Sequence, residues 1–136
     1  MTVVKASART TKQAPAANFT GTVYSDEIVA GTAPSRMRAS VVSFTPGART
    51  AWHSHPVGQT LYGLSGVGRI QFKGQPVRAI EPGDTVLIPP DMLHWHGAAP
   101  NRLFSHLAMS EHSDTGAGTA WFEYVSDADY AATPAP

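Results

Sequence analysis

The stretch PGARTAWHSHPVGQTLYGLSG, residues 46–66, decides how the rest of the chain is interpreted. Within it, His53 and His55 are separated by one residue, so on an extended strand their side chains leave the same face. Gln59 follows after a Pro-Val-Gly turn and brings an amide oxygen to the same region. Imidazole nitrogens and amide oxygens are competent ligands for first-row divalent metals. This stretch therefore predicts part of a metal site.

A second stretch, GDTVLIPPDMLHWH at residues 83–96, repeats the His-x-His spacing with His94 and His96. Together the two stretches predict one divalent metal per chain, bound by His53, His55, Gln59 and His94. Three imidazoles and one amide suit manganese, iron, nickel, zinc or copper, so the residues alone leave the identity of the metal open.

The composition of the chain predicts a single globular domain. It has 136 residues, 42% of them hydrophobic and 15% charged, which is enough to bury a core. Ten basic residues balance ten acidic ones without a run of one sign, which argues against nucleic acid or an anionic membrane as partner. Cysteine is absent, which excludes disulfides and a thiolate metal site. No apolar leader segment opens the chain, so we expect a cytoplasmic protein.

Short β-branched or alternating segments separated by Gly and Pro turns predict eight to ten β-strands. These segments are residues 19–28, 37–45, 59–64, 69–72, 77–80, 85–88, 94–97, 103–109 and 119–125. Ser126, followed by two aspartates, predicts the start of a short C-terminal helical turn. The pattern favours an all-β fold, either a β-barrel or a double-sheet jelly roll. We expect an N-terminal arm at 1–17, a barrel at 18–130 and a disordered tail at 131–136.

The two histidine stretches resemble the two motifs of the cupin superfamily. The first motif, G-x5-H-x-H-x(3,4)-E-x6-G, is matched in spacing from Gly47 to Gly66. The second, G-x5-P-x-G-x2-H-x3-N, is matched in spacing from Gly83 to Ala98. Three residues depart from the usual types, namely Gln59 for Glu, Asp91 for Gly and Ala98 for Asn. The resemblance implies a jelly-roll barrel with the metal inside.

A narrower group resembles most of the chain, from about Asn18 to Tyr130. The segments AWHSHPVGQTLYGLSG, IPPDMLHWHGAAP and SHLAMSE are similar to the small bacterial cupin hydroxynitrile lyases, whose metal site carries a glutamine among three histidines. The resemblance implies manganese as the metal. It also implies a reversible cleavage of a cyanohydrin into hydrogen cyanide and an aldehyde or ketone.

Two further histidines are candidates for proton transfer. His106 lies in the strand predicted at 103–109, and its ordinary pKa near neutrality suits a general base, although it can equally be a barrel histidine bonded to a carbonyl. His96 shares the face of His94. It is a second candidate catalytic residue, or else a residue that supports the metal ligands without binding the metal itself. If the face of 37–45 that carries Ser40 points inward, the substrate pocket is lined by Ser40, Val42, Phe44 and Leu61, some of which can also be ordinary core residues.

These residues predict a metal-dependent lyase that acts on a small molecule. A neutral Gln59 leaves the full charge on the cation, which favours Lewis-acid chemistry over oxidation of the metal. Two alternatives stay open, a metal-dependent oxygenase of a small organic substrate and a non-catalytic cupin that binds a small ligand. Exposed strand edges and the N-terminal arm predict a homo-oligomer, either a dimer or a tetramer.

Overall fold

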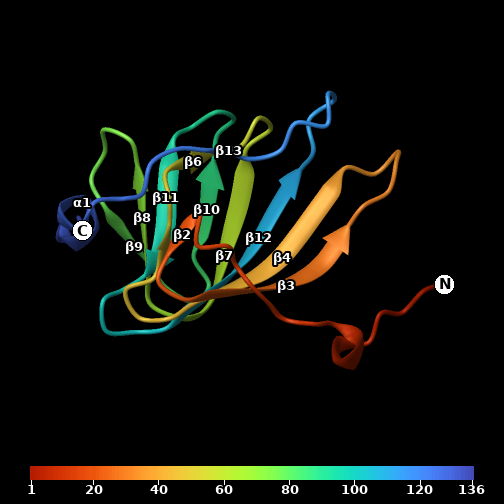
Figure 1. The fold of residues 1–136 in the computed structure, drawn as a ribbon, viewed down its shortest axis with the longest axis horizontal. Helices are drawn as coiled ribbons and strands as arrows, with labels where there is room; N and C mark the ends of the chain where they lie inside the picture. Colours follow the sequence, from red (N-terminus) through yellow and green to blue (C-terminus); the bar gives the residue numbers. More distant parts are fainter.

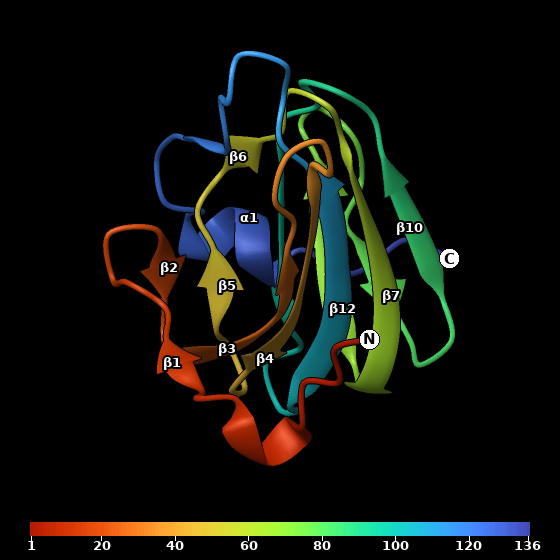
Figure 2. The ribbon, with the colours of Figure 1, turned by 90° about the vertical axis from the view of Figure 1, so that its right-hand side faces the viewer.

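The structure is a computed structural model that describes residues 1–136. Its strands form two antiparallel sheets that face each other and enclose a barrel, as Figures 1 and 2 show. The expected all-β fold with one short C-terminal helix is therefore confirmed. The helical segments are η1 (Ala6–Ala8) and α1 (Asp127–Ala131), and neither has the length and hydropathy needed to cross a membrane.

The first sheet has six strands. Their order is β1 (Lys12–Gln13), β3 (Val23–Ala30), β4 (Met37–Phe44), β12 (Phe104–Glu111), β7 (Gln59–Gly66) and β10 (Thr85–Ile88). The second sheet has seven strands. Its main path is β13 (Ala120–Trp121), β6 (His53–Ser54), β11 (His94–Ala98), β5 (Arg49–Thr50) and β2 (Phe19–Thr20), and β11 also pairs with β8 (Gly68–Phe72), which pairs with β9 (Arg78–Ile80).

Two of the predicted strands differ from the observed ones. The segment 19–28 was expected to be one strand, but Gly21 has a φ of 78° and divides it into β2 and β3, which belong to different sheets. The segment 119–125 forms only the two-residue strand β13. The helix start is as expected, since the Asp129 amide donates to the Ser126 hydroxyl at 3.1 Å.

Both ends of the chain are attached to the barrel. Within the N-terminal arm, β1 pairs with the outer edge of β3, while the first residues extend away from the barrel in Figure 1. The structure departs from the expected disordered tail at 131–136. The Ala135 amide donates to the Val77 carbonyl at 2.8 Å, and Ala135 forms a parallel bridge with Arg78. The free edge of β9 offers unpaired backbone groups, which explains why the tail is ordered there.

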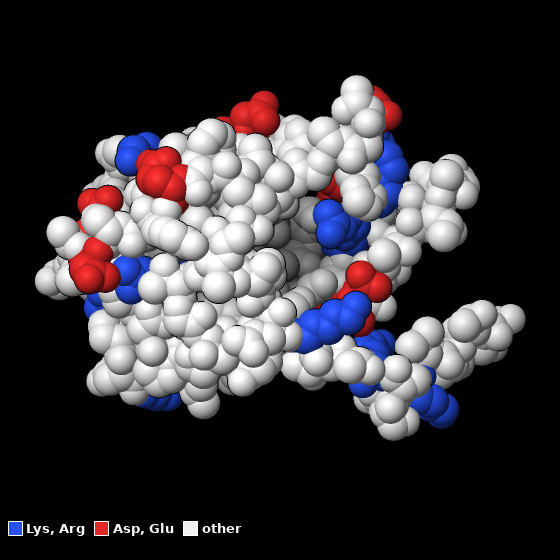
Figure 3. All heavy atoms as spheres, viewed as in Figure 1, with Lys and Arg blue, Asp and Glu red and all other residues white.

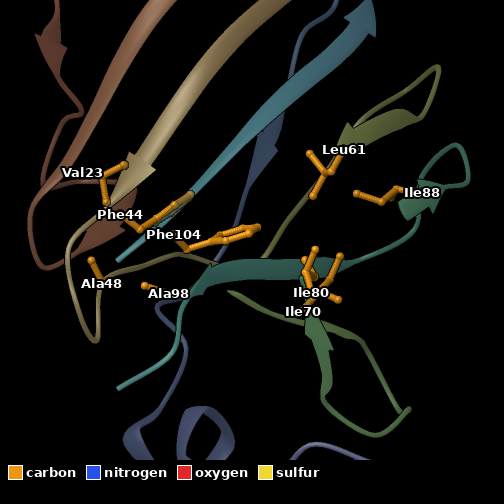
Figure 4. Packing of buried hydrophobic residues seen from close by; sticks show 9 residues of the cluster. All are labelled: Val23, Phe44, Ala48, Leu61, Ile70, Ile80, Ile88, Ala98 and Phe104. Carbon is orange, nitrogen blue, oxygen red and sulfur yellow. The ribbon is translucent and has the colours of Figure 1, made fainter. Parts of the chain in front are cut away.

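The apolar core is formed by residues of both sheets, and Figure 4 shows its side chains. It contains Val23, Phe44, Ala48, Leu61, Ile70, Ile80, Ile88, Ala98 and Phe104. A second cluster lies between the outer face of the second sheet and the C-terminal segment, and contains Trp52, Val77, Trp95, Val125 and Tyr130. Trp95 therefore packs outward, while its neighbours His94 and His96 point into the barrel, as alternation along a strand requires.

The turns of the two histidine stretches contact each other. The Asp91 amide donates to the His55 carbonyl at 2.8 Å. Asp91 has a φ of 60°, so it adopts the left-handed conformation for which the cupin motif usually has glycine. Aspartate tolerates this region better than most residues, which explains why the departure from the motif leaves the turn intact.

Candidate metal centre

Four rows of inward side chains cross β4 and β12. Phe44 lies opposite Phe104 at the apolar end, followed by Val42 opposite His106, Ser40 opposite Ala108, and Arg38 opposite Ser110. Side chains two residues apart on a strand share a face, so each step advances about 7 Å toward the mouth of the barrel. A cavity of about 170 Å³ lies beyond the apolar rows. Figure 3 shows a hollow on one face of the molecule, with both Lys or Arg atoms and Asp or Glu atoms at its rim.

Three histidines meet on the opposite wall of the cavity. His53 on β6 and His94 on β11 are directly paired, and their ring centroids are 4.2 Å apart. His96 lies two residues farther along β11. One ring nitrogen from each of His53, His94 and His96 lies within 4.8 Å of the others, and all three residues are buried. These three histidines could hold a metal ion.

The predicted ligands are oriented through their Nδ1 atoms. The Nδ1 of His53 is 2.9 Å from the Ala51 carbonyl, and that of His94 is 2.8 Å from the Met92 carbonyl. The Nδ1 of His55 is instead 3.2 Å from the Thr119 hydroxyl. A backbone carbonyl can only accept, so in His53 and His94 it fixes the proton on Nδ1 and leaves Nε2 as the ligand atom, which is the usual arrangement of metal-binding histidines.

Several buried polar atoms in the cavity have no hydrogen-bond partner within the chain. They are the Nε2 atoms of His55, His94 and His96 and the Oε1 atom of Gln59. A buried polar atom without a partner is costly, and such atoms rarely gather in one place without a ligand. The Nε2 atoms of His55 and His94 and the Oε1 atom of Gln59 can donate electron pairs, so a cation fits the cavity. The donor atoms are neutral nitrogen and amide oxygen, which suits a first-row divalent metal.

Burial keeps the cavity histidines neutral. It lowers the pKa of His94 and His106 to about 4, and lowers that of His55 to about 4 even though the Gln59 side chain acts in the opposite direction. Burial and the neighbouring histidines lower the pKa of His53 and His96 well below its usual value. Neutral imidazole is the form that binds metals and accepts protons.

The two candidates for proton transfer form a pair. The Nε2 of His106 is 3.0 Å from the Nδ1 of His96, so the pair shares one proton in this hydrogen bond. Phe44 packs against both rings, with centroid distances of 5.5 Å to His106 and 5.9 Å to His96. The remaining nitrogen of each ring, Nδ1 of His106 and Nε2 of His96, is buried without a partner.

The structure divides the predicted pocket residues into two groups. Ser40 and Val42 line the cavity, whereas Phe44, one row deeper, and Leu61, beside Ala108, are fully buried in the apolar core. Nine other lining residues were not among the predicted site residues, and they include Phe19, Arg38, Thr119 and Trp121. The two-residue period of 37–45 already places Arg38 on the face of Ser40. No local pattern could have placed Trp121, whose ring lies 4.7 Å from that of His53.

Comparisons with known proteins agree with this geometry. A family model for the cupin domain matches residues 40–105. Over 130 residues, which are 96% of this chain and 98% of the relative, the sequence is 42% identical to a protein of Granulicella tundricola named (R)-mandelonitrile lyase. This chain belongs to the cupin family.

Solved structures extend the comparison. This cupin is similar to a cupin-like protein from Thermotoga maritima, with 37% identity, a TM-score of 0.82 and coverage of 87% of this chain and 89% of the other. It also resembles a polyketide cyclase from Streptomyces resistomycificus, with a TM-score of 0.74 and coverage of 96% and 90%. The second pair is only 15% identical, so that likeness concerns the fold alone.

Proposed function

We propose that this cupin is a metal-dependent lyase that cleaves cyanohydrins into hydrogen cyanide and an aldehyde or ketone. The observation that carries the proposal is the cavity itself, in which a cluster of neutral metal-binding side chains lies beside a buried histidine pair. The name of the Granulicella relative supports this reaction, because its likeness spans nearly the whole length of both chains.

We further propose that His53, His55, His94 and Gln59 hold the metal, with manganese as the ion. His53 and His94 belong to the cluster of three buried histidines, and His55 and Gln59 add two unpartnered donor atoms beside it. His96 is assigned to proton transfer because its Nδ1 is bonded to His106 rather than to a carbonyl or hydroxyl. When bound, such a cation supplies Lewis-acid stabilisation of negative charge on a substrate oxygen.

The histidine pair carries the proton. His106 accepts the hydroxyl proton of the cyanohydrin at Nδ1, which has no partner in the chain, while its Nε2 remains bonded to His96. The oxygen electrons form the carbonyl as the carbon–carbon bond to cyanide breaks. The departing cyanide takes the electron pair of that bond and the proton from His106. A pKa of about 4 leaves His106 unprotonated at mildly acidic pH, so it is ready to accept.

The rest of the cavity suits a small organic substrate. Val42 and Ala108 line it from the six-stranded sheet, and Phe19 and Trp121 line it from the second sheet. These apolar groups can contact an aryl or alkyl substituent, while the buried site excludes bulk water from the charge that develops on oxygen.

The test is the release of benzaldehyde from mandelonitrile at mildly acidic pH by manganese-loaded protein and by His106→Ala. We expect turnover by the parent protein and a loss of roughly 100-fold or more in His106→Ala with the metal content unchanged, as for other general bases. His112→Ala, in the loop after β12, is the matched control and should behave like the parent. Full turnover by His106→Ala would remove His106 from the mechanism, and an inactive parent with bound manganese would refute the lyase assignment.

A further inference from the structure

Arg38 is a cation at the mouth of the metal cavity. It lies on the inner face of β4, opposite Ser110 of β12, which in turn lies opposite Gln59 of β7. Arg38 and Gln59 are thus two strand spacings apart, about 10 Å between backbones. Both residues line the same cavity, and an arginine side chain is long enough to reach a molecule bound beside Gln59.

The guanidinium of Arg38 has no ion-pair partner in the chain. The ion pairs join Arg36 to Asp114 and Arg49 to Asp127, and no carboxylate oxygen lies within 4.0 Å of Arg38. Its cross-strand neighbours, Ala30 and Ser110, are uncharged.

Carboxylates on the neighbouring strands do not neutralise this charge. Glu27 lies opposite Ser40 and Glu111 lies opposite Met37, yet neither forms an ion pair with Arg38. On the other side, a methyl group added at Gly118 would lie 4.0 Å from the Arg38 Nη1 atom, so the guanidinium is adjacent to the loop before β13.

An arginine without an ion-pair partner beside neutral metal ligands points to a negatively charged bound molecule. All the candidate metal ligands are neutral side chains, so they bring no negative charge to the cation, and no carboxylate forms an ion pair with Arg38. A planar guanidinium binds carboxylates through two parallel hydrogen bonds, and such charge-assisted bonds are stronger than neutral ones. Between Arg38 and the cavity histidines, the wall consists of Ser40, Val42 and Ala108. These side chains can contact a short apolar part of a bound molecule.

We propose that the cavity selects organic carboxylates in which an apolar spacer separates the carboxylate from the reacting oxygen. Arg38 binds the carboxylate at the mouth, and the hydroxyl or carbonyl oxygen lies among the histidines. This inference rests on the cavity being the substrate site of the proposed lyase. It does not depend on cyanide being the leaving group.

The experiment compares two ligands of the same shape, 4-(hydroxymethyl)benzoate and 4-(hydroxymethyl)benzamide. Their binding to manganese-loaded protein is measured by calorimetry for the parent, Arg38→Gln and Arg38→Lys. We expect the parent to prefer the carboxylate by about tenfold or more, since a charge-assisted pair contributes over 1.4 kcal/mol. Arg38→Gln should abolish this preference, and Arg38→Lys should keep part of it because the charge remains without the planar pair of donors.

Arg102→Gln, which makes the same charge change in the loop between β11 and β12, is the control and should retain the parent preference. A preference that survives in Arg38→Gln would show that the metal or another group binds the carboxylate, and would overturn the proposal. Equal binding of the two ligands by the parent would overturn it as well. Mandelonitrile is uncharged, so its cleavage by the parent protein tests the lyase assignment separately, and the failure of one proposal can be distinguished from the failure of the other.

Discussion

The two ends of the metal cavity are constructed differently. At the inner end, His53 and His94 are almost fully buried and their Nδ1 atoms face the backbone carbonyls of residues two positions earlier. At the mouth, His55 is oriented by the hydroxyl of Thr119, which lies 64 residues later, and Arg38 has no partner. Local hydrogen bonds therefore orient the rings of His53 and His94, whereas a distant segment orients His55 at the mouth. We expect the inner end to control metal retention and the mouth to adjust affinity and select the substrate.

The largest expected effect concerns the ligands of the inner end. His94→Ala should weaken metal binding by more than about 100-fold. Changing a residue that only orients a ligand typically lowers metal affinity by about 10–100-fold, and losing the ligand itself should lower it further. His96→Ala should retain about one metal per chain, since we assign His96 to proton transfer. Metal content after dialysis distinguishes the two variants. Equal metal loss in both would make His53, His94 and His96 the ligand set and would refute our assignment of His55 and Gln59.

The next effect concerns the burial of the cavity histidines at both ends. Their pKa values lie below the ordinary 6.5 in the folded protein, to about 4 for His55, His94 and His106. The unfolded chain therefore binds more protons below pH 6.5. Stability of the metal-free protein should fall as pH drops from about 6.5 to about 4, by up to about 1.4 kcal/mol per pH unit for each such histidine.

Urea unfolding of metal-free protein at several pH values between 7.5 and 4 measures this loss. Bound metal should oppose it, since the cation binds the neutral ligands of the folded state. A stability that stays constant from pH 6.5 to pH 4 would show that these histidines are solvated, in conflict with a closed inner end.

The smallest effect concerns the mouth. Thr119→Val keeps the shape of the side chain but removes the oxygen 3.2 Å from the His55 Nδ1. We expect metal affinity to fall by about tenfold, at the low end of the range for groups that orient a ligand, because His53 and His94 remain fixed. Competition with a chelator measures the change. Thr115→Val, in the preceding loop, is the control, and identical affinities for all three proteins would mean that the mouth does not orient His55.

The same contrast explains which features the sequence predicts. Alternation along a strand and a short turn are local properties, so the spacing of His53, His55 and Gln59 could be interpreted directly, whereas His94 meets His53 only because β11 pairs with β6. Most strands followed from β-branched segments and Gly or Pro turns. The family resemblance, confirmed by the cupin match and the 42% identical relative, added the barrel and the activity to test.

Features that depend on distant contacts could not be predicted in this way. Trp121 and Thr119 reach the cavity only because β13 pairs with β6, a pairing of segments about 65 residues apart. The tail at 131–136 is ordered because it meets the free edge of β9. Leu61 and Phe44 follow the inward pattern expected of pocket residues, but alternation does not show which inward side chains other side chains cover, and both lie in the apolar core.

The most direct test of the account is a titration of metal-free protein with manganese while mandelonitrile cleavage is measured. The account predicts a rate that rises in proportion to occupancy, reaches its maximum at one metal per chain, and returns to background when a chelator removes the ion. Cleavage by the metal-free protein at the same rate, or no cleavage at full occupancy, would contradict the claim that the histidine cavity is a metal-dependent lyase site.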